Sequence, residues 1–330
     1  MKRLLYVAIL LFVTSNADAQ YKWEYGLAIG GANYLGDIGG QADIGRDFVP
    51  WDMHLGQTNI AIGAYGRYKA SKRFSLAANF TYLQVNDADN ISTNPARVAR
   101  NLNFRNRMFE LGLRGEFTVF YDNDVGGKGY YNPDFRLYVF GGLSAFRHNP
   151  QGQILSDPTG EFDAAVWHDL RGWRTEGQDE EYETIGLAIP AGIGLYFTFN
   201  KEWRIGWEIS YRTTFTDYID DLSTTYADPE LIRERLGGNT SEAAAAVTFS
   251  SQTNQTIIDF IADPINSGSV NDHSYQEGFA TKRGDSSQND GFLTSQFTIG
   301  KVIRGSSNFY RKKYSWLRNR TGSRKSRAKF

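Results

Sequence analysis

Two adjacent alternating segments within residues 185–216 constrain the fold most strongly. From Ile185 to Phe199 one parity is apolar throughout, and the other parity consists mostly of glycine and other small residues. From Trp203 to Phe215 aromatic and aliphatic residues alternate with glycine, serine and charged residues, after a two-residue turn at Asn200-Lys201. Because strand side chains alternate between two faces, each set occupies one face. An apolar outer face with a small or polar inner face is typical of a transmembrane β-barrel strand.

Similar alternation marks further segments, which together make eight candidate strands. They are Trp23–Asn33, Thr58–Lys69, Arg73–Val85, Arg105–Tyr121, Phe135–Arg147, the pair described above, and Gly291–Val302. Only Phe135–Arg147 is apolar on both faces, so the sequence does not show which of its faces points outward. A tilted strand crosses a bilayer in about 9–11 residues, and bacterial outer-membrane barrels have even strand numbers. We therefore predict an all-β fold, an eight-stranded antiparallel transmembrane outer-membrane β-barrel.

The connections between these segments alternate in length. Residues 70–72 and 200–201 are tight turns, whereas 34–57, 87–103, 148–184 and 217–290 are long. Short periplasmic turns and long extracellular loops are typical of outer-membrane barrels, although the 122–134 connection is longer than usual for a turn. Aromatic residues near the strand ends predict two interfacial girdles. The expected outer girdle contains Tyr34, Tyr82, Phe104, Phe215 and Tyr218.

The loop at 217–290 carries helix signals. Asp228-Pro229-Glu230 resembles a helix start before Leu231–Leu236, and Ser241-Glu242 precedes an alanine-rich run. An isoleucine stripe follows from Ile257 to Ile261. We expect a small lid or docking platform in this extracellular loop.

Three domains are predicted: a signal peptide at 1–19, the barrel at 20–302 and a basic tail at 303–330. The first has a charged start, a short apolar stretch and the A-x-A site Ala17-Asp18-Ala19. The sequence contains no cysteine, so a lipoprotein anchor, a disulfide and a thiolate metal site are not expected. We expect the protein in the outer membrane of a Gram-negative cell, in contact with its lipid, with both termini in the periplasm.

The tail differs sharply in charge from the rest of the chain. It holds ten Lys or Arg and no Asp or Glu, whereas residues 20–302 hold 24 basic and 36 acidic residues, a net charge of −12. Such asymmetry indicates a partner. A nucleic-acid partner is excluded because the tail is expected in the periplasm. Three interpretations of the tail remain: a solvated tail, an arm that binds anionic lipid, and an arm that docks on a protein partner. The partner-binding candidates are Phe309, Tyr310, Arg311, Lys312, Lys313, Tyr314, Trp316, Arg318 and Arg320.

The inward parity of the strands carries charges of both signs. The predicted interior charge network consists of Glu110, Arg114, Glu116, Arg204, Glu208 and Arg212. Because buried charges must be paired or solvated, this mixture favours a salt-bridged plug in a barrel whose eight strands enclose little space. A narrow ion or proton path, or a passive channel, is the alternative.

No catalytic residue, cofactor, metal site or small-molecule substrate is predicted. Some small outer-membrane barrels modify lipid or lipopolysaccharide, and His54, His148 and Ser156 are the residue types that such an enzyme would use. No sequence spacing pairs them. The acidic stretch Asp217–Asp221 offers oxygen ligands of the kind that calcium prefers, but it lacks EF-hand spacing, and a solvated strand end is the simpler interpretation.

Four stretches resemble a known family. They are Gly30–Asp37, Arg100–Asn106, Thr214–Tyr226, and Gly284-Asp285 with Asn289-Asp290. Together they are similar to the PorG-like outer-membrane β-barrels of the type IX secretion and gliding machinery of Bacteroidetes. The resemblance implies a non-enzymatic barrel that anchors or assembles the periplasmic ring of a PorK-like lipoprotein and a PorN-like protein.

Overall fold

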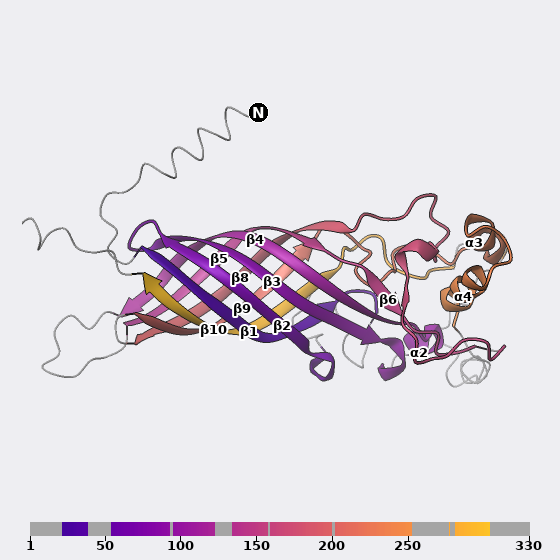
Figure 1. The fold of residues 1–330 in the computed structure, drawn as a ribbon, viewed down its shortest axis with the longest axis horizontal. Coiled ribbons are helices and arrows are strands. Elements are labelled where there is room, and N and C mark those ends of the chain that lie inside the picture. Colours follow the sequence, from indigo (N-terminus) through magenta and orange to yellow (C-terminus); the bar gives the residue numbers. More distant parts are fainter. Residues whose placement is uncertain are drawn as a thin grey trace, which may run out of the picture.

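A closed antiparallel barrel forms one end of the molecule (Figure 1). The computed structural model describes residues 22–38, 54–92, 95–122, 134–157, 159–199, 202–252, 277 and 281–303. Within these ranges eight long strands form the barrel. They are β1 (Trp23–Leu35), β2 (Asn59–Lys69), β3 (Phe74–Ala88), β4 (Asn103–Asp122), β5 (Asp134–Arg147), β8 (Ile185–Phe199), β9 (Trp203–Thr214) and β10 (Gly291–Ile303).

The barrel is closed by two pairings. The first and last strands run antiparallel from Trp23 opposite Ile303 to Leu35 opposite Gly291. The strand order β3-β2-β1-β10-β9-β8-β5-β4 then closes because β3 also pairs with β4. A closed ladder leaves no strand edge and satisfies its backbone groups internally, which a bilayer requires.

The predicted strands agree with the observed ones to within three residues at every compared end. The fold class predicted from the alternation is thereby confirmed. The turn at Asn200-Lys201, the signal peptide at 1–19 and residues 304–330 of the tail lie outside the described residues.

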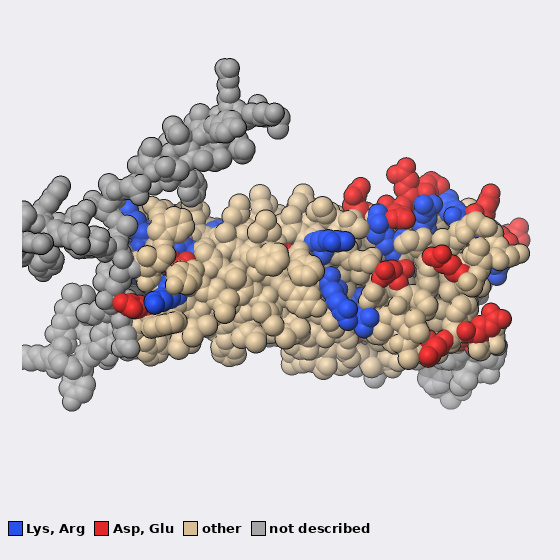
Figure 2. Space-filling model, viewed as in Figure 1, with Lys and Arg blue, Asp and Glu red and all other residues tan. Residues whose placement is uncertain are grey.

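The outer face of the barrel is apolar. Leu27, Leu113 and Phe297 are 62%, 66% and 66% exposed, and the wall around mid-barrel carries almost no charge (Figure 2). The facing of β5 is also settled: Val139 and Leu143 point outward, whereas Tyr138, Phe140 and Phe146 point inward. No helix in the described ranges is long and apolar enough to cross a bilayer.

At the other end the long connections fold into a compact extension of the barrel, which we call the cap (Figure 1). It contains α2 (Pro95–Arg100), α3 (Pro229–Arg235), α4 (Ser241–Ser250), the short strands β6 (Pro150–Gly152) and β7 (His168–Asp169), and the 3-10 turns η2 (Leu55–Gln57), η3 (Asp89–Ile91) and η4 (Arg171–Trp173). β6 pairs with β4 and β7 pairs with β6, so the barrel sheet extends into the cap.

The cap has its own hydrophobic core. Large side chains from the barrel end and from several loops are buried together, among them Phe104, Phe249 and Phe292. Two residues of the expected outer girdle belong here instead: Tyr34 is 2% exposed and Phe104 is fully buried. That part of the girdle prediction was wrong because β1 and β4 extend into the cap, where their inner face contacts protein.

Two cap helices begin where the sequence predicts. Asp228 caps α3 by accepting a hydrogen bond from the Glu230 amide at 2.9 Å, and Gly237 and Gly238 follow the helix with positive φ. The predicted isoleucine stripe at 257–261 lies outside the described residues.

Candidate functional site

The barrel interior contains a network of ion pairs centred on Arg67. Its guanidinium donates to Glu116 at 2.6 Å, to Glu24 at 3.0 Å and to Glu208 at 3.2 Å. Arg67 extends from β2 and the three carboxylates from β4, β1 and β9, so one side chain connects four strands. All four side chains are at least 92% buried.

Three further arginines complete the network. Arg114 donates to Glu208 at 2.7 Å and to Glu116 at 3.2 Å, and Arg204 pairs with Glu24. Nearer the cap, Nη2 and Nε of Arg212 donate to the two carboxylate oxygens of Glu110, at 3.0 and 3.2 Å. This bidentate geometry is the strongest form of an arginine–carboxylate pair.

The six predicted interior residues therefore all face inward, and apart from the Arg114–Glu116 contact within β4 their partners are on other strands. The sequence places Glu110 and Arg114 on one face of β4; the structure pairs Glu110 with Arg212 of β9 instead. Residues four apart along a strand are about 13 Å apart, whereas neighbouring and opposite walls of a small barrel lie within side-chain reach.

Aromatic rings fill the space between the ion pairs. The Arg67 guanidinium lies 5.1–5.3 Å from the ring centres of Tyr65, Tyr138 and Tyr196, and Arg114 lies 4.3 Å from that of Phe140. Cations at this distance from a ring face are attracted to it. Tyr138 also donates a hydrogen bond to Glu208 and accepts one from Arg67 at 3.0 Å.

The glycines of the inner parity make room for these rings. A methyl group built on Gly194 would lie 2.5 Å from the Tyr138 ring, which is closer than carbon atoms approach in proteins. The small-residue parity that marks 185–199 in the sequence thus has a packing role. The paired charges and their aromatic neighbours occupy the middle of the barrel and leave water little access to it.

A second cluster lies where the barrel meets the cap. We call it the mouth cluster, and it consists of Tyr34, Asp37, Arg100, Asp220 and Asp290. Tyr34 donates to Asp290, and the other carboxylate oxygen of Asp290 accepts from the Ile219 amide at 2.8 Å. Arg100 donates to the Asp37 and Arg283 carbonyls, both at 2.8 Å, and to both oxygens of Asp89, each at 2.8 Å.

The mouth cluster joins the four stretches that carry the family resemblance. Asp220 accepts from the Ile38 amide at 2.9 Å, and Asp37 accepts from the Asp285 amide at 2.5 Å. Asn106 donates to the Ile219 carbonyl at 2.7 Å. Because these contacts join residues that are far apart in the sequence, the four stretches hold the loops together at the end of the barrel.

The acidic stretch Asp217–Asp221 is buried, and its interpretation as a solvated strand end was wrong. Burial, with the charge of Asp37, raises the pKa of Asp220 to about 8. Burial raises the pKa of Asp217 to about 8 as well, with contributions from Asp220, Asp37 and Glu176. In the described part of the chain no group of three or more His, Asp or Glu side chains is arranged to hold a metal ion, so the calcium alternative gains no support.

Arg283 stabilises the same region from the cap side. It is fully buried and lies 3.1 Å from Glu176, 2.8 Å from the Asp221 carbonyl and 3.6 Å from the Asp221 carboxylate. Thr175 and Tyr182 donate to the two oxygens of Asp221 at 2.5 and 2.9 Å. These contacts tie the 148–184 connection to the loop after β9.

The residues proposed for an enzyme are not brought together. His148 is buried against the rings of Phe146 and Tyr182, with centroids 5.5 and 6.1 Å away, and burial lowers its pKa to about 4. The Ser156 amide is bonded to Gln252, and the structure, which describes all three candidates, records no hydrogen bond between any two of His54, His148 and Ser156.

The nine partner-binding candidates between Phe309 and Arg320 lie outside the described residues. Sequence reasoning missed the mouth cluster as a unit, and it missed Tyr138 because the facing of Phe135–Arg147 could not be decided. The acidic and aromatic residues at the ends of the long loops were visible, but their mutual contacts depend on the folded loops.

Residues 2–165 match the model of a family described as a domain of unknown function (DUF6089). Among curated proteins none matches the sequence significantly.

Three solved structures are similar to the chain. The N-terminal β-barrel domain of OprF from Pseudomonas aeruginosa is 10% identical, with 86% of this chain and 98% of that chain covered and a TM-score of 0.30. Ail, the attachment invasion locus protein of Yersinia pestis, is 9% identical, with 86% and 99% covered and a TM-score of 0.32. Neisserial surface protein A is 6% identical, with 85% and 97% covered and a TM-score of 0.31. Such values support no residue correspondence, so the barrel assignment rests on the strand pairing described above.

Proposed function

We propose that this outer-membrane barrel is a non-enzymatic component of the type IX secretion system that anchors or assembles a periplasmic PorK/PorN-like ring. The filled barrel interior is the observation that supports a barrel without a conducting path or a catalytic site. Arg67 and its three carboxylates span the middle of the barrel, so the membrane part is a solid scaffold. A scaffold acts through its two ends.

In this proposal the end of the barrel with the tight β2–β3 connection faces the periplasm, because short turns are typical of that side. Residues 70–73 join β2 to β3 there, and β1 begins and β10 ends at the same level, with Trp23 opposite Ile303. The basic chain that continues beyond Ile303 therefore starts on that side. Its ten Lys or Arg suit an acidic protein surface or anionic lipid, and the resemblance to the PorG-like family names a ring as the partner.

Affinity purification from native membranes tests this proposal. We would compare the full-length protein with a version that ends after Ile303, which keeps the complete β10 ladder. A matched variant would replace Arg311, Lys312 and Lys313 by glutamine and leave the aromatic residues in place. Loss of ring proteins in both altered forms, with recovery by the full-length protein, is the expected result.

Other outcomes discriminate further. If the shortened and full-length forms recover ring proteins equally, the anchor remains but the tail is not the dock. If the full-length protein recovers none, the assembly function is wrong. Planar-bilayer recordings on the same preparation check the scaffold: stepwise conductance at neutral pH would contradict a filled interior.

A further inference from the structure

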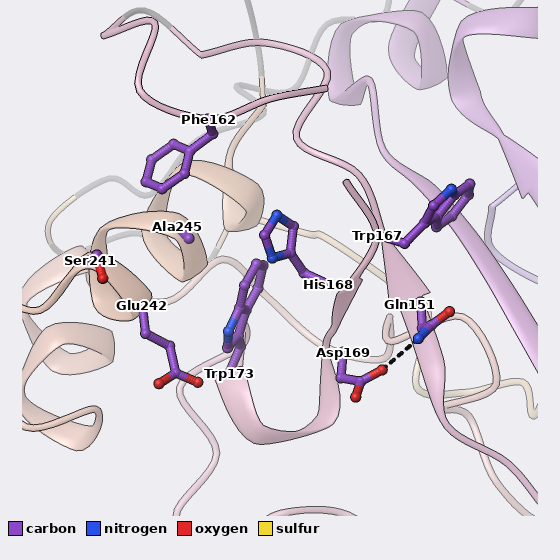
Figure 3. Close-up of a pocket in the computed structure, with 9 residues that line it drawn as sticks. All are labelled: Gln151, Phe162, Trp167, His168, Asp169, Trp173, Ser241, Glu242 and Ala245. Atoms are coloured by element: carbon purple, nitrogen blue, oxygen red, sulfur yellow. Dashed lines mark hydrogen bonds between the residues drawn. The ribbon is translucent and has the colours of Figure 1, made fainter. Parts of the chain in front are cut away.

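The cap contains a pocket of about 460 Å³ between α4, β6, β7 and η4 (Figure 3). Phe162, His168 and Trp173 form its aromatic side, and Gln151, Asp169 and Glu242 its polar side. Pockets that bind small molecules typically measure about 300–1,000 Å³ and combine apolar walls with a few placed polar groups. The pocket lies in the cap, and its lining includes no residue of the barrel interior network.

The aromatic side is rigid. The Trp173 ring packs between His168 and Phe249, at centroid distances of 5.0 and 5.9 Å, and is 4% exposed. Phe162 stands on the other side of the opening, across from His168 and Trp173 (Figure 3). Trp173 supports the partly exposed His168 ring from behind, so His168 offers contact area without the entropic cost of ordering a flexible side chain.

The polar side offers several hydrogen-bonding groups. Asp169 accepts from Gln151 at 2.7 Å, and Gln151 accepts from Arg105 at 2.9 Å, so this wall is oriented by its own contacts. Glu242 is exposed at the first turn of α4, where the helix N-terminus favours its charge. Within the described ranges the buried Nε2 atom of His168 has no hydrogen-bond partner.

The charges select the kind of ligand. Asp169 and Glu242 are the charged groups of the lining, and they repel phosphates, sulfates and carboxylates. Arg105, which lies behind this wall over the Trp167 ring at 4.1 Å, offsets the charge of Asp169, so a cation is not strongly favoured either. A neutral ring with one apolar face and hydroxyl groups along its edge fits both sides of the pocket.

We infer that this pocket binds a neutral pyranose saccharide, with its C–H face against the rings of Phe162 and His168 and its hydroxyl groups donating to Glu242 and Asp169. The inference does not depend on the association with a periplasmic ring. It gives the cap a binding role of its own.

Saturation-transfer NMR on the full-length protein tests the site. The protein would be held in a polyoxyethylene detergent, because sugar-headed detergents would occupy the pocket. The probes are the methyl glycosides of glucose, galactose and N-acetylglucosamine, with glucuronate and choline as anionic and cationic probes. We expect saturable binding of at least one neutral glycoside, strongest saturation at its ring C–H protons, and none for glucuronate.

Two variants locate the site and one serves as a control. Glu242→Gln should weaken binding about tenfold, because a hydrogen bond to a charged acceptor is lost, and Phe162→Ala should weaken it as well. Glu234→Gln, an exposed acid on α3 outside the pocket, should bind like the parent protein. The proposal is overturned if no neutral glycoside binds, if choline alone binds, or if both pocket variants bind the glycoside as tightly as the parent.

Discussion

Replacing Arg67 by methionine is the most direct test of the barrel interior. The substitution keeps most of the side-chain volume but removes the guanidinium that reaches Glu24, Glu116 and Glu208. Glu116 then keeps Arg114 as its cationic partner at 3.2 Å, while Glu24 keeps Arg204. Breaking a buried ion pair by removing one partner costs about 3–5 kcal/mol because a buried charge is left uncompensated. We expect a loss in this range.

The measurement is guanidinium unfolding of the barrel in lipid vesicles, followed by tryptophan fluorescence. The control is Arg107→Met, which removes an exposed arginine of β4 and should shift stability by no more than ~0.5 kcal/mol. A double variant with Glu116→Gln should recover part of the loss, because Glu24 and Glu208 are then balanced by Arg204 and Arg114. Equal unfolding midpoints for Arg67→Met and Arg107→Met would refute the assigned role of the network, and so would a double variant less stable than Arg67→Met.

Three further predictions concern packing, the cap and pH. Gly194→Ala should destabilise the barrel by ~1–3 kcal/mol through overpacking, whereas Gly66→Ala, with no atom near the added methyl, should leave the same unfolding midpoint nearly unchanged. Arg283→Met should make the cap sensitive to protease on intact cells while the barrel remains folded, and the exposed neighbour Lys282→Met should not. Because the pKa of Asp217 rises from 3.8 to about 8 on folding, the folded cap retains a proton that the unfolded chain loses, so cap stability should fall as pH rises from 4 to 8. Asp217→Asn should flatten that decline in thermal unfolding; an unchanged slope would show that Asp217 titrates normally.

The membrane-spanning part of the fold could be predicted because its physical requirement is local. A strand in lipid needs an apolar outer parity, and a small barrel needs small or paired inner residues, so 185–199 and 203–214 reveal both faces in the sequence. The facing of 135–147 could not be predicted since both of its faces are apolar. Its inner face carries Tyr138 and Phe140, which pack against arginines of other strands.

The presence of ion pairs inside the barrel could be predicted, but the two partners of each pair could not. Alternation places Glu110, Glu208 and Arg212 inside, but which carboxylate meets which guanidinium depends on the register and curvature of the closed barrel. The same limit applies to Tyr34, whose position at the end of β1 suggested a membrane girdle. Its hydroxyl instead meets Asp290, 256 residues later in the chain, at a level where the barrel is surrounded by cap.

The mouth cluster changes what the family resemblance can support. In the stretches that carry it, Arg100, Asp220 and Asp290 are buried and Asp37 is partly buried, and these stretches are bonded mainly to one another. Buried residues of this kind maintain a loop arrangement and present almost no surface to a partner. A chain could therefore keep these motifs and the fold while contacting a different protein, since the motifs constrain the junction of barrel and cap. The surfaces that can distinguish one such barrel from another are the cap exterior, where the saccharide pocket opens, and the basic chain that follows Ile303. Ring association must accordingly be tested at that basic chain, as in the comparison of the full-length and shortened proteins, because the motifs would persist in a relative that binds no ring.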